Sequence, residues 1–248
     1  LKQFHKKAPN IVWEVPKGEG YATPAVVGDR VLLFHRLGDK EVLECFQAEN
    51  GKRLWRADYP TDYQDRYGFN GGPRCQPISD GERVYTTGVE GKLSCFKLTN
   101  GDVVWRRDIV KEYRLQQNFF GVGSTPLLEG NLLIVNVGAT GGPCVVALDK
   151  LTGKPVWEAG KQWGASYASP VAGVVHGKRR VFVFAGGESR PATGGLLCID
   201  PTNGKVDFEF AWRGRRYESV NASSPVLIGN SVYISECYGA GGKIGRAH

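Results

Sequence analysis

The stretch Ala147-Leu148-Asp149-Lys150-Leu151-Thr152-Gly153-Lys154-Pro155-Val156-Trp157 decides the fold, because the chain repeats it. Related stretches cover residues 45–55, 95–105 and 198–208, so the pattern recurs about every 50 residues. In every copy a glycine stands in the predicted turn, just before the strand that carries the final aromatic residue. The residues to which we assign a structural role in this repeat are Gly51, Trp55, Gly101, Trp105, Asp149, Thr152, Gly153, Trp157, Gly204 and Phe208.

Two further sequence elements share this period. A small or polar residue followed by proline stands at the start of each unit, at Pro24, Pro77, Pro126, Pro170 and Pro225. After each proline come a turn and a run rich in β-branched and aromatic residues, which covers residues 30–35, 83–87, 132–137, 180–185 and 231–236. Each unit therefore predicts four short strands. In the first unit these are residues 24–27, 30–35 and 41–47, with a fourth strand that ends near residue 58.

The architecture follows from this repeat. No stretch keeps the 3.6-residue apolar period of an α-helix over three turns. Four-stranded units of roughly 40–50 residues that recur around a channel are the blades of a β-propeller. A β-sandwich, the other all-β architecture considered, would have strands at similar spacing but no strict repeat. The sequence therefore predicts an all-β protein, a β-propeller of four-stranded blades.

The third copy matches in full the A-x-D-x-x-T-G-x-x-x-W motif of pyrroloquinoline-quinone-like (PQQ-like) propeller repeats, and the chain resembles this family over nearly its whole length. The other copies depart from the motif, since Cys replaces Ala, Asn replaces Thr and Phe208 replaces the last Trp. The resemblance is greatest to the non-catalytic bacterial members, which include the lipoprotein of the outer-membrane barrel-assembly machinery. In that family the Trp packs between neighbouring blades. Catalytic and silent members share the motif, so it indicates fold and not chemistry.

The repeats predict a single partial propeller over residues 1–248, with blades at about 24–59, 77–110, 126–160 and 170–212. A partial blade at about 225–238 is expected to stop after its second strand, because residues 241–248 leave the repeat. Residues 11–15 resemble a fourth strand without a blade, and in the family such a strand often closes the last blade. The resemblance implies seven or eight blades in a complete propeller. We therefore expect an incomplete arc of four to five blades, a fragment from which the remaining blades are missing.

Long loops are expected on one face of this arc. The turns between strands one and two and between strands three and four are short, whereas the remaining loops and the links between blades are long and varied. Binding residues concentrate on the long loops of rigid scaffolds, and Tyr and Arg are enriched in interface hot spots. The richest link gives the candidate binding residues Tyr59, Asp62, Tyr63, Asp65, Arg66, Tyr67 and Arg74. The other interpretation is a loop folded over its blade, with packed aromatic rings and solvated Asp–Arg pairs.

Composition and motifs exclude several classes of function. A hydrophobic content of 41% with 23% charged residues is typical of a soluble globular protein, and no apolar run reaches the 18 or so residues of a transmembrane segment. The net charge of +7 comes with no basic stripe or known module, so no nucleic-acid partner is expected. The four histidines are scattered, and neither a CxxC pair nor a calcium-loop spacing occurs. We therefore assign no catalytic residue and no metal site.

The function expected from these observations is a non-catalytic scaffold that binds a protein or peptide through its long-loop face, without a cofactor. The alternative implied by the resemblance is a quinoprotein alcohol or sugar dehydrogenase that uses PQQ with calcium. Alcohol-oxidising members of that kind carry an adjacent Cys-Cys pair, which this sequence lacks. The resemblance alone implies a periplasmic or otherwise exported protein, since the sequence shows no signal peptide.

Overall fold

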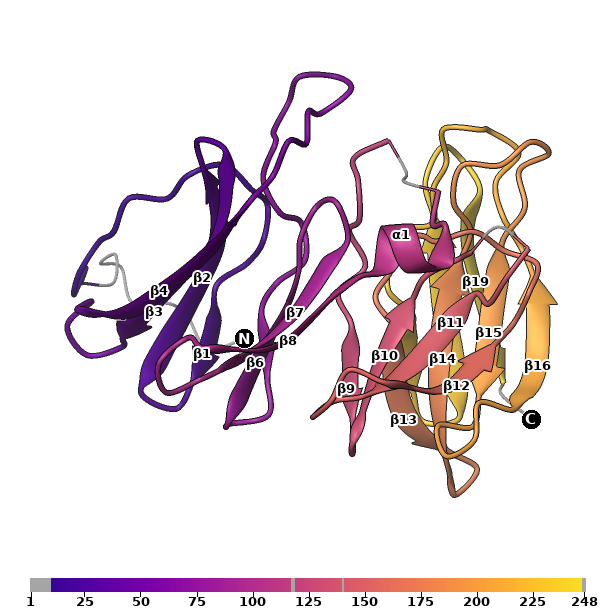
Figure 1. Cartoon of the computed structure of the whole chain (residues 1–248). Helices are drawn as coiled ribbons and strands as arrows, with labels where there is room; N and C mark the ends of the chain where they lie inside the picture. Colours follow the sequence, from indigo (N-terminus) through magenta and orange to yellow (C-terminus); the bar gives the residue numbers. More distant parts are fainter. Residues whose placement is uncertain (1–9, 117–118, 140, 247–248) are drawn as a thin grey trace.

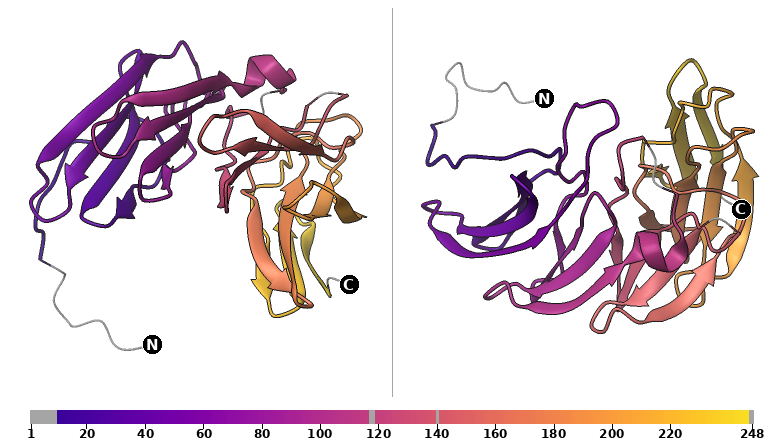
Figure 2. Two further views of the ribbon diagram at one scale, coloured as in Figure 1. Left: turned by 60° about the horizontal axis from the view of Figure 1, so that its bottom comes forward. Right: turned by 45° about the horizontal axis from the view of Figure 1, so that its top comes forward.

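The computed structural model describes residues 10–116, 119–139 and 141–246, and nearly all of their regular structure is β-strand. The strands form five separate antiparallel sheets. These sheets follow one another in chain order along an open curve, from the indigo sheet to the yellow one (Figures 1 and 2). The predicted all-β architecture, an incomplete arc of propeller blades, is thereby confirmed.

In each of the first four sheets, four strands pair in the order in which they occur in the chain. The first sheet contains β1 (Ala25–Val27), β2 (Arg30–Leu37), β3 (Lys40–Gln47) and β4 (Arg53–Pro60). The second contains β5 (Ile78–Ser79), β6 (Arg83–Thr87), β7 (Lys92–Lys97) and β8 (Val103–Asp108). The third contains β9 (Leu127–Glu129), β10 (Leu132–Asn136), β11 (Val145–Asp149) and β12 (Pro155–Ala159). The fourth contains β13 (Val171–Val175), β14 (Lys178–Ala185), β15 (Gly195–Ile199) and β16 (Val206–Ala211).

The fifth sheet differs from the expectation for residues 241–246. It contains β17 (Val226–Ile228), β18 (Ser231–Glu236) and a third strand, β19 (Gly241–Arg246), which pairs antiparallel with β18. The prediction that the repeat stops after the second strand was therefore wrong for these residues, while residues 247–248 lie outside the described part. All six residues of β19 are exposed, so the strand is held by its backbone pairing with β18. Its sequence shows no alternating apolar pattern that would have predicted a strand.

A single short helix, α1 (Ile109–Tyr113), is present among the described residues, in the link after β8. It begins after Asp108, whose side chain accepts a hydrogen bond from the Lys111 backbone N–H. It ends at Arg114, which adopts a left-handed conformation. Within the described ranges no helix is long and apolar enough to cross a membrane.

The tryptophan of each repeat covers the glycine of the next blade. A Cβ atom added to Gly153, where φ is +70°, would lie 2.8 Å from the Trp105 ring. The Trp105 Nε1–H donates to the carbonyl oxygen of Lys150 at 3.0 Å. The same two contacts recur in the neighbouring blades, between Trp55 and both Gly101 and Leu98, and between Trp157 and both Gly204 and Pro201.

Trp13 makes this contact without a blade of its own. Its ring lies against the Cβ position of Gly51, and its Nε1–H donates to the Ala48 carbonyl oxygen at 2.8 Å. Residues 11–15 form no strand in the described structure. The closing strand therefore stays a prediction, although Trp13 occupies the place that a preceding blade would give to its own tryptophan.

The hydrophobic core is divided among the interfaces between blades. Four clusters of buried side chains lie between successive sheets, and the cluster between the third and fourth sheets includes Ile134, Trp157, Val183 and Leu197. In stacked repeats, stability is approximately a sum of such nearest-neighbour terms. Each blade therefore depends on its neighbours for burial, and the loops at the ends of the strands are left to carry function.

Candidate functional site

The long connections meet at one end of the sheets, on the upper side of Figure 1. Antiparallel pairing places the links between blades at this end, together with the loops between second and third strands. The short turns lie at the opposite end. The segments of the long-loop face that make contact with one another are residues 61–75, 119–124, 161–168, 186–195 and 213–223.

A buried ion pair shapes the link between the first two blades. The Arg74 Nη2 atom lies 2.9 Å from Asp65 Oδ2, and the two side chains are only 9% and 2% exposed. The second Asp65 oxygen, Oδ1, accepts a hydrogen bond from the Tyr67 backbone N–H at 2.8 Å. Arg74 also donates to the backbone carbonyl oxygens of Asn70 and Gly72. These contacts fix the link in one conformation, which places Tyr67 and its neighbours.

A second ion pair joins parts of the chain that are 122 residues apart. Arg66 Nη1 lies 3.1 Å from Glu188 Oε1. Glu188 is on the loop that follows β14. The Tyr217 hydroxyl donates to the same Glu188 oxygen at 3.3 Å. The Arg66 guanidinium also lies over the Phe119 ring, 5.3 Å from its centroid. The first and fourth blades are thus connected across the long-loop face.

An aromatic platform stands beside this bridge, and we define it as Tyr67, Phe69 and Phe120. The ring centroids of these residues lie 5.7–6.5 Å apart. Tyr67 is 51% exposed and Phe69 is 70% exposed. Behind them, the Tyr167 hydroxyl accepts a hydrogen bond from the Phe120 backbone N–H at 2.8 Å. Burial raises the pKa of Tyr167, so this hydroxyl stays neutral.

The structure brings together only part of the predicted binding set. Tyr59 is buried between the first two blades, and burial raises the pKa of its hydroxyl. It is therefore not part of the exposed surface. Tyr63 is half-buried, and its ring centroid lies 5.5 Å from the Arg74 guanidinium. Asp62 is exposed and forms no ion pair with any described residue. Asp65 and Arg74 act inside the link, which leaves Arg66 and Tyr67 at the surface.

Several residues of this site were missed by sequence reasoning. Glu188, Phe119, Phe120, Tyr167 and Tyr217 lie on links and loops of other blades. Their sequence signal was only their position in long connections of the same face. Which of these connections touch depends on the rotation between successive blades, which a repeat pattern does not specify.

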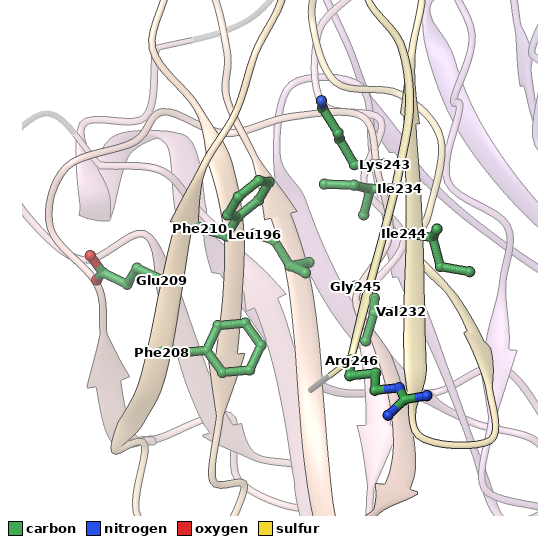
Figure 3. A pocket seen from close by; sticks show the side chains of 10 residues that line it. All are labelled: Leu196, Phe208, Glu209, Phe210, Val232, Ile234, Lys243, Ile244, Gly245 and Arg246. Atoms are coloured by element: carbon green, nitrogen blue, oxygen red, sulfur yellow. The ribbon is translucent and has the colours of Figure 1, made fainter. Parts of the chain in front are cut away.

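An apolar pocket of about 410 Å³ lies between the fourth and fifth blades. Figure 3 shows Phe208 and Phe210 on one side of it, facing Val232 and Ile234 on the other. At the other blade interfaces a tryptophan of the repeat rests on the glycine turn that follows the third strand of the next blade. Here Phe208 takes the tryptophan position, and the described fifth sheet has no such turn. The residues that line the pocket lie on strands, away from the long-loop face.

The described residues include no cluster of candidate metal ligands. In residues 10–116, 119–139 and 141–246, no group of three His, Cys, Asp or Glu side chains could hold a metal ion. Calcium takes six to eight oxygen ligands, whereas the carboxylates of Asp65 and Glu188 are already bound to Arg74 and Arg66. What the site does offer is exposed aromatic and guanidinium groups on a fixed backbone.

The fold and this site define an open arc of propeller blades with a built loop face. A family described as outer membrane protein assembly factor BamB matches residues 38–247. The chain therefore belongs to this family of PQQ-like repeat proteins. No curated protein matches the chain.

Solved structures share the fold at low sequence identity. BamB from Moraxella catarrhalis aligns with a TM-score of 0.54 and 14% identity, over 94% of this chain and 71% of that one. Quinohemoprotein alcohol dehydrogenase from Comamonas testosteroni gives 0.60 and 14%, over 89% and 40%. A europium-containing methanol dehydrogenase gives 0.65 and 11%, over 92% and 50%. The chain thus spans half or less of either dehydrogenase, and these likenesses concern the fold alone.

Proposed function

We propose that this protein is a non-catalytic scaffold that binds a protein or peptide partner through its long-loop face, in the outer membrane protein assembly that its family description names. The observation that carries the proposal is the aromatic platform, in which Tyr67 and Phe69 stay exposed although they stand on a tightly bonded link. Exposed aromatic groups of this kind are typical anchors of protein interfaces.

Rigidity is the second argument for a binding surface. Ordering a loop on binding costs free energy, and a surface that is already fixed avoids much of that cost. The Asp65–Arg74 pair fixes the link, and the Arg66–Glu188 pair ties it to the fourth blade. The platform is therefore presented in one arrangement to an incoming chain.

A role in outer membrane protein assembly implies that the protein is located outside the cytoplasm. We accordingly propose a periplasmic or otherwise exported location. Fractionation of host cells should recover the protein with the envelope, and recovery with the cytosol would contradict this location.

The competing function is a dehydrogenase that uses PQQ with calcium, and a titration separates the two. The protein is titrated with pyrroloquinoline quinone in the presence of calcium, and the quinone absorbance and the reduction of an artificial electron acceptor by an alcohol or sugar are followed. We expect neither stoichiometric binding nor acceptor reduction, because the carboxylates of Asp65 and Glu188 on the long-loop face are held in ion pairs. Tight stoichiometric binding with acceptor reduction would overturn the scaffold proposal.

A further inference from the structure

A second pocket, of about 380 Å³, lies on the long-loop face beside the fifth blade. One wall is the link that follows β16, and the other is the turn between β18 and β19. Its polar lining consists of Arg213, Arg215, Arg216, Ser219, Cys237 and Tyr238. Its remaining lining includes Gly214, Gly239 and Ala240, whose small size leaves the walls open to the close approach of another main chain.

Three arginines give this pocket its positive charge, and Glu236 is the carboxylate whose charge acts on Arg213. Arg215 and Arg216 are exposed, and none of the three forms an ion pair with a described residue. Of the nearby acids, Glu236 is buried and is bound by the Gly214 N–H and the Ser219 hydroxyl. Glu218 is exposed in the same link. The pocket therefore combines three cations with one enclosed carboxylate.

Arg213 gives this pocket a fixed floor. Its guanidinium donates to the Thr193 carbonyl oxygen at 3.0 Å and to the carbonyl oxygens of Gly187 and Ser219. It thus ties the loop after β14 to the link after β16. Its Nε atom is buried without a hydrogen-bond partner, and burial lowers the pKa of its side chain. A buried cation that is bonded to neutral carbonyls favours a nearby anion.

Tyr238 supplies an independent sign of a binding site. Its φ is +55°, a left-handed conformation that is uncommon for a bulky residue. Its side chain is 59% exposed, and the Arg216 guanidinium lies over its ring, 5.9 Å from the centroid. Backbone strain of this kind clusters at ligand-binding sites. The strained turn holds the ring and Arg216 together at the mouth of the pocket.

We infer that this pocket binds the carboxylates of an acidic peptide segment, so that the partner of the long-loop face offers Asp or Glu side chains to Arg215 and Arg216. The inference rests on the proposed function, and it adds the chemical class of the partner. The planar guanidinium fork matches a carboxylate through two parallel hydrogen bonds. The net charge of +7 favours the approach of such a segment.

Fluorescence anisotropy of a labelled peptide of alternating Asp and Gly tests the inference on the full chain. Its Asn–Gly counterpart is the reference peptide. The R215Q/R216Q variant should bind the acidic peptide about tenfold more weakly, as expected for the loss of charge-assisted hydrogen bonds. The matched control is K52Q/K154Q, which removes two exposed positive charges from the short turns of the opposite face. Equal losses in the two variants, or equal binding of the two peptides, would overturn the inference.

Cys237 provides a second readout at the pocket itself. It is exposed, whereas the other five cysteines are buried, so a neutral alkylating reagent should label it selectively. The acidic peptide should slow this labelling in the wild-type protein and not in R215Q/R216Q. If millimolar inorganic phosphate protects Cys237 while the peptide does not, the pocket is a site for free anions and the inference fails. The proposed function fails separately, through quinone binding, which peptide affinity does not measure.

Discussion

At the scale of single residues, the repeat depends on a tryptophan ring that covers a glycine of the next blade. Glycine is favoured at this position for two reasons. It adopts a positive φ at low steric cost, and it leaves room for the ring, because a Cβ atom at Gly153 would come within 2.8 Å of Trp105. The spacing of Gly and Trp in the sequence is therefore the signature of a contact between blades.

Substitution of Gly153 by alanine should destabilise the protein by both effects. The matched control is Gly130→Ala, since Gly130 has a φ of +58° but a Cβ atom there would meet nothing within 4 Å. We expect a loss of about 1–2 kcal/mol for the control, from backbone strain alone. For Gly153→Ala we expect about 1–3 kcal/mol more, from overpacking against Trp105. Urea unfolding measures both variants, and equal losses would contradict the blade contact.

Glu41 should make stability depend on pH. Its Oε1 atom accepts a hydrogen bond from the Val89 backbone N–H at 2.8 Å, and burial raises the pKa of its carboxyl group. The folded protein therefore holds this proton more tightly than the unfolded chain does. The resulting stabilisation is complete below the ordinary Glu pKa of about 4.3, and it is lost as pH rises through the raised folded pKa.

The Glu41→Gln variant keeps an accepting oxygen and removes the titration. The free energy of unfolding of this variant, relative to the wild type, should rise as pH is raised from about 4 to 7. Urea unfolding at several pH values measures the difference. A difference that is constant across this range would show that Glu41 titrates normally in the folded protein.

At the scale of elements, the link between the first two blades is held by the Asp65–Arg74 pair. Asp65→Asn leaves the Arg74 charge without a carboxylate in a buried position. We expect a loss of about 3–5 kcal/mol in the stability of the folded link, the usual cost of breaking a buried pair from one side. Trypsin should then cleave faster after Arg66. Asp62→Asn is the control, because Asp62 is exposed in the same link, and equal cleavage rates in the two variants would contradict the role of the pair.

The elements themselves were largely predictable, because strands that pack between neighbouring blades are short runs of buried apolar side chains. β14 (Lys178–Ala185) is an example, with five buried residues in succession at its end. β19 was not predictable from such a pattern, since it contains three glycines and buries no side chain. Residues 11–15 carry a strand-like sequence, and they form no strand in the described structure.

At the scale of the whole molecule, the contacts of the candidate site could not be predicted. The sequence indicated the face, through loop length, and one of the links on it. The Arg66–Glu188 pair spans 122 residues, and no local pattern encodes the rotation that brings the first and fourth blades together. For the same reason the sequence did not reveal that Tyr59 is buried beneath the second blade.

The molecule as a whole is an arc whose two faces, one at each end of the strands, differ in their loops. Short turns occupy one end, and the other carries the aromatic platform, the Arg66–Glu188 bridge and the arginine pocket. The core is divided among blade interfaces, and the long loops add buried residues such as Val122 and Trp163 to it. A binding function on this face is thus compatible with the repeat that builds the fold.

Site-specific photocrosslinking in the host cell tests the central claim most directly. A photoreactive phenylalanine analogue is placed at Phe69, on the aromatic platform, or at Leu151, an exposed residue in a short turn of the opposite face. The account predicts a discrete crosslinked protein partner from position 69 and none from position 151. Crosslinks to the same partner from position 151 alone, or no crosslink from position 69, would contradict it.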